Sequence, residues 1–285
     1  MSPEKLRFDT TDVTPLIGTA VRTDTETLLS GTVAQEIRAL LEQRGVLVFP
    51  QVELNDEQQN AFTRTLGTQA YENNGVADER GNRQTIFKVS LDSKVNPIGE
   101  YFKVSFFWHL DGPMHEVPIL ASILSAKHIP STGGATEFCN TYAAYDALPE
   151  SDKKAIENLE VVHANWALQR YVNPEPSYAQ FRRMKDVVPE RTQPLVWRHR
   201  SGRKSLVLGA TAAYVIGMGP TESWDLLVRL RDWATQPQFV YRHEWAVGDT
   251  VIWDNTGTLH RAIPYSPDSG RLLHRTILQG EEPFA

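Results

Sequence analysis

The sequence predicts a mainly β protein, a barrel or sandwich with a few helices packed on its outside. Short apolar runs separated by turn clusters recur along the chain, whereas helical periodicity is confined to a few segments. With 285 residues, 41% of them hydrophobic, the chain can bury a full core. All-β domains often reach this length, so we expect residues 1–285 to form a single domain.

The N-terminal part is predicted to alternate strands with helices. We expect strands over 16–21 and 45–50, and helices over 33–44 and 55–66. In the first helix Ile37 and Leu41 recur at helical spacing, and Gly45 stands where a C-cap glycine belongs. The second helix begins with Asn55 and has Gln58 three residues later, which is the pattern of a capping box.

The middle of the chain combines strands with long polar stretches. We expect strands over 86–89 and 119–127, a turn into a strand over 133–138, and helix over 142–158 interrupted at Pro149. Residues 71–105 are polar and irregular and precede a candidate site, so we expect them to form a lid loop. Residues 166–194 have no clear periodicity, and we expect an irregular insertion there.

The C-terminal third is predicted to be strand-rich. We expect strands over 195–198, 205–208, 239–243, 250–253 and 272–278, the first two joined as a hairpin. A helix is expected over 221–234, with Trp224, Leu227, Leu230 and Trp233 as its buried positions.

Charge and composition exclude several classes of partner. The formal net charge is −6 and the basic residues are scattered, so a nucleic-acid partner is not expected. No apolar run reaches the length of a membrane span, and residues 1–11 do not resemble a signal peptide, so we expect a cytoplasmic protein without a membrane partner. The single Cys139 excludes an internal disulfide, fits a reducing compartment and is expected to be a small buried hydrophobe.

His109 and Asp111 are the first candidates for a metal site. They lie two residues apart in an apolar, aromatic run, so on extended backbone both side chains leave the same face. An H-x-D pair also arises easily by chance, and His109 could instead be a core histidine with one hydrogen bond. A second histidine in the right place would make the two-histidine, one-carboxylate triad of non-haem iron(II) oxygenases.

His260 is the natural third ligand, because it follows the apolar strand expected at 250–253 and a turn. Arg271 and Arg275 come eleven and fifteen residues after it. Their even spacing places both guanidinium groups on one face of a strand. Arginines directed into a barrel each need an anionic partner, because an unpaired buried charge is costly.

These segments form a pattern when taken together. The chain contains W-H-x-D at 108–111, G-G-x-T-x-F at 133–138, W-D-N at 253–255 before L-H-R-A, and then the two arginines. This pattern resembles the taurine dioxygenase and phenoxyacetate dioxygenase family, and is nearest to its aryloxyalkanoate-degrading branch. The resemblance runs from residue 46 to residue 278.

The resemblance implies a double-stranded β-helix, a cupin-like jelly roll. It implies that His109, Asp111 and His260 hold Fe(II) and form the catalytic centre. It assigns 2-oxoglutarate to Thr136 and Arg271, and the substrate anion to Arg275. Such enzymes use dioxygen as co-substrate, and the family leads us to expect a homo-oligomer.

The implied reaction couples oxidative decarboxylation of 2-oxoglutarate to hydroxylation of a small organic acid. An aryloxyalkanoate, a sulfonate or a similar anion would be the substrate, with C–O or C–S cleavage when the hydroxylated carbon carries an ether oxygen or a sulfonate. The carboxylate of Asp111 favours hydroxylation over halogenation, because no ligand position is left vacant for a halide. Ser105, Phe107 and neighbouring aromatic residues would line the substrate pocket or belong to the core.

Two departures from the family pattern and two other functions remain open. Thr256 and Gly257 follow W-D-N where the family usually has arginine, and the residues around the H-x-D differ from the taurine enzyme's substrate contacts. A non-catalytic, cupin-like module would bind 2-oxoglutarate without oxygen consumption. A zinc-dependent hydrolase could use the same three ligands, but it would not need Arg271.

Overall fold

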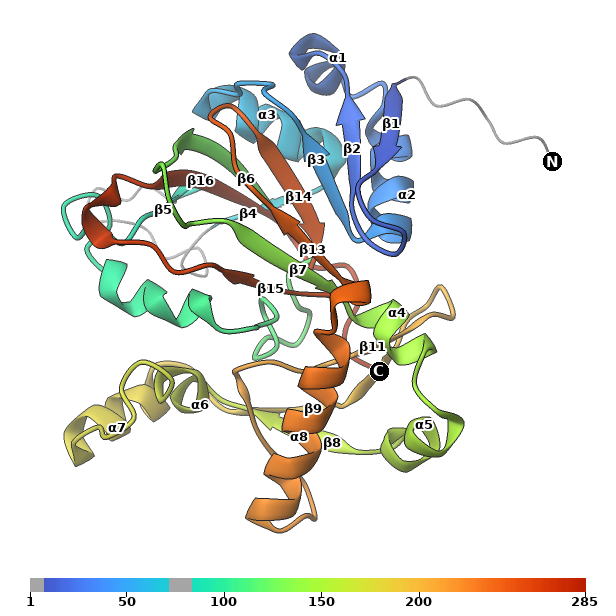
Figure 1. Cartoon of the computed structure of the whole chain (residues 1–285), viewed down its shortest axis with the longest axis vertical. Helices are drawn as coiled ribbons and strands as arrows, with labels where there is room; N and C mark the ends of the chain where they lie inside the picture. The colour runs from blue at the N-terminus through green and yellow to red at the C-terminus, as the bar shows by residue number, and fades with distance from the viewer. Residues whose placement is uncertain (1–7, 72–83) are drawn as a thin grey trace.

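The computed structural model describes residues 8–71 and 84–285, and its centre is an eight-stranded sheet. Along its main path the strand order is β1-β2-β3-β14-β6-β16-β4, and β5 pairs with Leu273–Arg275 of β16 (Figure 1). Among the strands of the described residues, the β2–β3 pair alone is parallel. The strands are β1 (Asp9–Asp12), β2 (Thr19–Arg22), β3 (Val46–Phe49), β4 (Gln69–Ala70), β5 (Phe87–Val89), β6 (Ala121–His128), β14 (Thr250–Asp254) and β16 (Leu272–Leu278).

A second, three-stranded sheet packs against this one. Its order is β13-β7-β15, formed by β13 (Val240–His243), β7 (Thr136–Asn140) and β15 (Thr258–Ala262). Phe138 from β7 meets Val251 and Trp253 from β14 and Leu124 from β6 in one buried cluster. Two sheets closed over a shared core in this way form the jelly roll that the sequence predicts.

Three helices cover the outer face of the large sheet. They are α1 (Thr25–Ser30), α2 (Ala34–Arg44) and α3 (Asp56–Leu66). Strand residues alternate between the two faces, because successive side chains point to opposite sides. Val251 and Trp253 therefore face the small sheet, whereas Ile252 between them packs with Ile37 and Phe62 of the helices.

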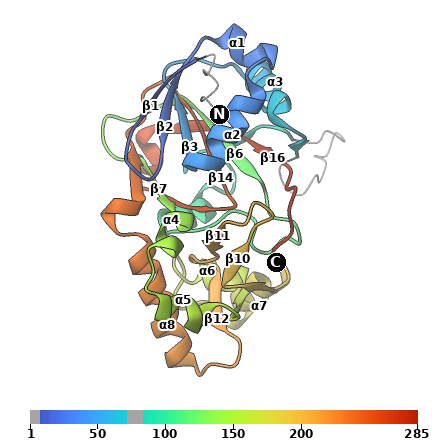
Figure 2. The same cartoon turned by 90° about the vertical axis from the view of Figure 1, so that its right-hand side faces the viewer.

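The opposite end of the molecule is built from the remaining helices and two small sheets (Figures 1 and 2). The sheets are β12-β8-β9 and β10-β11, made of β8 (Glu160–His163), β9 (Arg191–Pro194), β10 (Val196–Arg198), β11 (Lys204–Leu206) and β12 (Ala212–Val215). The helices are α4 (Thr141–Asp146), α5 (Glu150–Ile156), α6 (Asn165–Gln169), α7 (Tyr178–Asp186) and α8 (Pro220–Ala234). Cys139 and Leu259 of the small sheet pack against Leu230 of α8, so this sheet is covered on both faces.

Most of the strongly patterned elements are where the sequence predicts them. The Asn55–Gln58 capping box is present, and the N–H of Gly45 donates to Leu41 O at the end of α2 with φ of 72°. The helix expected over 142–158 divides at Pro149 into α4 and α5. No helix in the described residues has the length and apolar character needed to cross a membrane.

Three expectations differ from the structure. Trp224 is 52% exposed on α8, so its predicted burial is wrong, although Leu227 and Leu230 are buried. The segment 166–194, expected to be irregular, contains most of α6 together with α7 and β9. In the segment 71–105 the strand expected at 86–89 is present as β5, but most of a 3-10 helix over Gly99–Phe106 was not expected, and residues 72–83 of the expected lid lie outside the described residues.

Candidate active site

Two backbone hydrogen bonds hold His109 beside His260. The N–H of His109 donates to His260 O at 3.0 Å, and the N–H of His260 donates to His109 O at 2.9 Å. Directly opposed residues of an antiparallel bridge leave the same face, and the two imidazole centroids lie 4.1 Å apart. Gly209 packs directly on the backbone of this segment, because a Cβ there would lie 2.9 Å from the Cα of His109.

Asp111 completes a group of three potential metal ligands. Its Oδ1 lies 3.9 Å from His109 Nε2, and its Oδ2 lies 3.8 Å from His260 Nε2. Two ligand atoms about 2.1 Å from an octahedral ion lie about 3.0 Å apart when they are cis, so these side chains would draw together by roughly 1 Å to bind one ion. Within the described ranges, this is the only cluster of three or more such side chains with metal-ligand spacing.

The protonation states of the cluster also suit a metal ion. Burial would raise the pKa of the Asp111 carboxyl, but His260, Arg275, His109 and a hydrogen bond from Ser122 outweigh burial and lower it to about 2. Burial lowers the pKa of His260 to about 3, so that imidazole is neutral at pH 7. An ionised carboxylate and a neutral imidazole are the forms that bind metal.

Neighbouring groups fix the orientation of both imidazole rings. His109 Nδ1 lies 2.8 Å from the carbonyl oxygen of Phe107, which leaves Nε2 directed to Asp111. The His260 ring packs against Trp253, with centroids 4.7 Å apart, and lies 6.4 Å from the centroid of Phe138, which itself packs on Trp253. Contacts of this kind restrict ligand rings before a metal arrives.

A cavity of about 70 Å³ opens beside the two histidines. Six of the eight predicted site residues line it: Ser105, His109, Thr136, His260, Arg271 and Arg275. Asp111 joins them through its separations from the histidines. Phe107 does not line this cavity: its ring packs on Tyr171, with centroids 4.6 Å apart, and the cavity is lined instead by the aromatic residues Phe102 and Trp253.

Arg271 is a buried cation at one end of the cavity. Its side chain is 2% exposed, and its Nε donates to Gly134 O at 2.9 Å. The guanidinium lies 4.6 Å from the centre of the Tyr265 ring, and no carboxylate among the described residues forms an ion pair with it. A buried charge without a counter-charge is costly, so this end of the cavity fits the carboxylate of 2-oxoglutarate.

Thr136 presents a hydroxyl donor to the same cavity. Its Oγ1 accepts a hydrogen bond from Trp245 Nε1 at 3.0 Å, so its own proton is available to another acceptor. Sequence reasoning missed Trp245, because nothing in its spacing ties it to Thr136. The only available signal is that a buried indole N–H requires a partner.

Arg275 lies at the aromatic side of the cavity. Its Nη1 is 3.7 Å from Asp111 Oδ2, and its guanidinium carbon is 5.4 Å from the centre of the Phe87 ring. Phe87 stacks on Phe102 with centroids 4.9 Å apart. A cation beside an apolar, aromatic wall suits an anion that carries a hydrophobic group.

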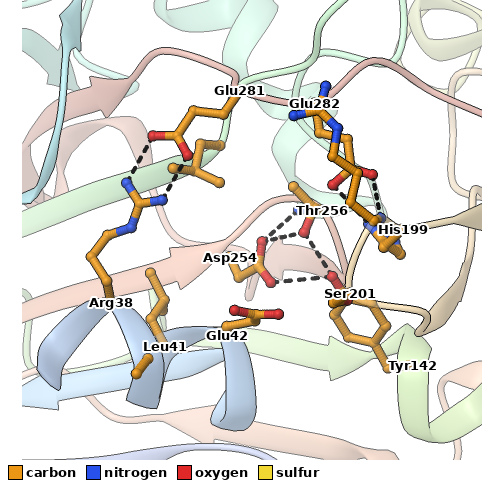
Figure 3. Close-up of a pocket in the computed structure, with 13 residues that line it drawn as sticks. Arg38, Leu41, Glu42, Tyr142, His199, Ser201, Asp254, Thr256, Glu281 and Glu282 are labelled. Carbon is orange, nitrogen blue, oxygen red and sulfur yellow. Dashed lines mark hydrogen bonds and ion pairs between the residues drawn. The ribbon is translucent and has the colours of Figure 1, made fainter. Parts of the chain in front are cut away.

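A larger cavity of about 470 Å³ lies elsewhere, between α2, the end of β14 and the C-terminal residues (Figure 3). Its lining includes the carboxylate of Asp254, which accepts hydrogen bonds from the N–H and the hydroxyl of Thr256. Burial raises the pKa of Asp254 to about 6. The described residues place no metal-ligand cluster here, so size alone does not identify the reactive centre.

Comparison with known proteins identifies the family. The family model described as "Taurine catabolism dioxygenase TauD, TfdA family" matches residues 9–277. The chain belongs to this family. It is 37% identical over 267 residues to the alpha-ketoglutarate-dependent 2,4-dichlorophenoxyacetate dioxygenase of Cupriavidus pinatubonensis, covering 88% of this chain and 90% of that protein.

Two further TauD/TfdA relatives agree over the whole fold. The (S)-phenoxypropionate/alpha-ketoglutarate-dioxygenase of Sphingobium herbicidovorans is 33% identical over 252 residues, 86% of each chain. The crystal structure of AAD-2 in complex with Mn(II) and N-oxalylglycine superposes with a TM-score of 0.82 at 30% identity, covering 98% of this chain and 99% of that one. The protein is therefore a dioxygenase that depends on Fe(II), 2-oxoglutarate and dioxygen.

Proposed function

We propose that the enzyme hydroxylates an aryloxyalkanoate or a closely similar aromatic acid. The observation that carries this proposal is the composition of one cavity. Two arginines, two histidines and the aromatic residues Phe102 and Trp253 line it, and Asp111 lies beside both histidines. Arg271 can bind 2-oxoglutarate, and Arg275 lines the same cavity on its aromatic side, where it can contact a second anion.

In this proposal His109, Asp111 and His260 hold the iron. Arg271 binds the distal carboxylate of 2-oxoglutarate through parallel N–H donors, and the Thr136 hydroxyl donates a further hydrogen bond. Bound Fe(II) supplies the redox chemistry that couples dioxygen to decarboxylation of 2-oxoglutarate and hydroxylation of the substrate. The chain itself orients both acids and keeps their reacting carbons close together.

Arg275 and the aromatic wall are proposed to select the substrate. Arg275 would bind its carboxylate, while Phe102, Leu124 and Val89 supply apolar contacts for an aryl group. Ser105 lines the same side of the cavity and can donate a hydrogen bond to an ether or carboxylate oxygen.

The test is 2-oxoglutarate-dependent succinate formation with phenoxyacetate, phenoxypropionates, an alkyl sulfate and taurine as candidate substrates. Replacing Arg275 by alanine should raise the KM of the preferred acid tenfold or more, because a charge-assisted hydrogen bond is lost. Arg242→Ala, at an arginine outside this cavity, is the control. An unchanged KM in Arg275→Ala, or turnover of taurine alone, would contradict the proposed substrate class.

The competing functions make different predictions. A zinc hydrolase has no use for the buried Arg271, and a binding module would show 2-oxoglutarate binding without oxygen uptake. His109→Ala and Asp111→Ala should each abolish substrate-dependent succinate formation. Retained turnover in either variant would exclude the proposed metal ligands.

We also propose that the enzyme is a cytoplasmic homo-oligomer. Tyr214, Ile216 and Trp224 are 41–52% exposed on β12, α8 and the connection between them, which supports a contact with another copy. Light scattering coupled to size-exclusion chromatography tests the assembly, and a Trp224→Glu variant should dissociate it. A monomer at micromolar concentration would contradict the proposal.

A further inference from the structure

Two buried polar side chains link the turn after β14 to the Asp111 carboxylate. The amide nitrogen Nδ2 of Asn255 donates to Ser122 Oγ at 2.9 Å, and the Ser122 hydroxyl donates to Asp111 Oδ2 at 3.0 Å. Both Ser122 and Asn255 are 0% exposed. Because a hydroxyl carries a single proton, the direction of both hydrogen bonds is determined by the ionised Asp111.

The position of Asn255 is itself fixed by the backbone. Its N–H donates to Leu120 O at 2.9 Å, while Asp254 and Thr256 on either side line the larger cavity (Figure 3). The side chain of Asn255 is therefore held inward, toward β6, between two residues at the other cavity.

Stability does not account for this asparagine. Its Oδ1 has no hydrogen-bond partner among the described residues, although the residue is fully buried. A buried polar atom left unsatisfied costs about 1–3 kcal/mol, so an apolar residue would suit the fold better. Side chains that break a local rule in this way are expected at functional sites.

The Asp111 oxygen that Ser122 holds also has a competing partner. Arg275 Nη1 lies 3.7 Å from the same Oδ2. Without the Ser122 hydroxyl, the carboxylate could rotate toward Arg275 and form a closer ion pair. That rotation would remove a ligand from the metal and occupy the cation proposed to bind the substrate.

We propose that Ser122 and Asn255 are positioning residues that hold the Asp111 carboxylate toward His109 and His260 and away from Arg275. This inference rests on the proposed role of Asp111 as a metal ligand. The two residues act in series: Asn255 orients Ser122, and Ser122 orients Asp111. They contact neither substrate nor 2-oxoglutarate in this arrangement.

The test uses the full chain, stripped of metal with a chelator and titrated anaerobically with Co(II). Ser122→Ala and Asn255→Ala should each bind Co(II) about 10- to 100-fold more weakly, the range typical of residues that orient metal ligands. The visible Co(II) spectrum should shift, because the geometry of the carboxylate changes. The double variant should be no weaker than Ser122→Ala, since both act on one hydrogen-bond chain.

Ser125→Ala is the matched control. Ser125 lies on the same strand, is 3% exposed and shares a hydrogen bond of 2.9 Å with Thr250 of β14, but lies three residues away on the opposite face. It should bind Co(II) as the unmodified chain does. Thermal unfolding of each metal-free variant separates weaker metal binding from loss of the fold.

The outcomes distinguish this inference from the proposed function. Co(II) affinity unchanged in Asp111→Ala would overturn both. Loss of affinity in Asp111→Ala, with Asn255→Ala and its spectrum unchanged, would overturn the positioning role alone, even if Ser122→Ala failed to fold. Additive effects of Ser122→Ala and Asn255→Ala on Co(II) affinity would show that the two residues act independently. That result would likewise refute the proposal that Asn255 acts through Ser122.

Discussion

Gly134→Ala should weaken 2-oxoglutarate binding by displacing Arg271. A Cβ at position 134 would lie 2.7 Å from Arg271 Cδ and 2.8 Å from its Nε, well inside the ordinary contact distance of about 3.5–4.0 Å. The arginine must therefore move by roughly 1 Å, which breaks its hydrogen bond to Gly134 O. Misplacing a charged donor costs about 1.5–3 kcal/mol, and the dissociation constant should rise about 10- to 150-fold.

The same substitution strains the backbone, and Gly202→Ala controls for that strain. Gly134 has φ of 77° and Gly202 has φ of 85°, but a Cβ at Gly202 meets nothing within 4 Å. Both variants should lose about 1–3 kcal/mol of stability. The assay is an anaerobic titration of the metal-loaded enzyme with 2-oxoglutarate, alongside thermal unfolding. If Gly134→Ala binds 2-oxoglutarate within twofold of Gly202→Ala, Arg271 is not the residue that holds it.

Two smaller effects should also be measurable. Trp245→Phe removes the N–H that orients Thr136 and should raise the 2-oxoglutarate dissociation constant about three- to tenfold. The control is Trp233→Phe, which loses a hydrogen bond to Ala144 O and should leave that constant unchanged. Equal effects of the two substitutions would contradict the proposed role of Thr136 in binding 2-oxoglutarate. Burial raises the pKa of Asp254 to about 6, so the folded chain retains that proton between about pH 4 and 6. The free energy of unfolding of the protein should therefore fall by up to about 3 kcal/mol as pH rises through this interval. Urea titrations at several pH values should show a smaller fall in Asp254→Asn. The same pH dependence in the unmodified chain and in Asp254→Asn would refute this.

Local sequence patterns were sufficient to predict an element where the pattern is typical of a single structure. The Asn55–Gln58 pair marked the start of α3, and the apolar run over 250–253 marked β14. The two histidines, Asp111 and both arginines could be placed together through the resemblance to the dioxygenase family, because the H-x-D pair alone left a core histidine equally open.

Other elements depend on contacts that local sequence does not encode. Strand β15 is half polar, and it forms because its backbone pairs with β7 and His109. Ser122 and Asn255 look ordinary in sequence, and their value appears only when β6 and the turn after β14 meet at Asp111. Helix α7 did have a local signal, since Ser177 and Gln180 form a capping box.

The aromatic run before Asp111 serves mainly to brace the site from outside. Trp108 is 8% exposed, and the guanidinium carbon of Arg261 lies 4.7 Å from the centre of its ring. Arg261 in turn pairs with Glu137 of β7, with Nη2 and Oε2 2.7 Å apart. These side chains tie together the three segments that carry His109, His260 and Thr136.

Phe106 supports the cavity at its other end. Its ring meets Tyr265 edge to face, with centroids 5.7 Å apart, and Tyr265 lies beneath the guanidinium of Arg271. The run therefore contacts Arg261, which adjoins His260, and Tyr265, which supports the buried Arg271. Since these contacts lie behind the reactive groups, substitutions in the run should alter metal and 2-oxoglutarate affinity together. Substrate preference should respond instead to Phe102, whose ring lines the cavity itself.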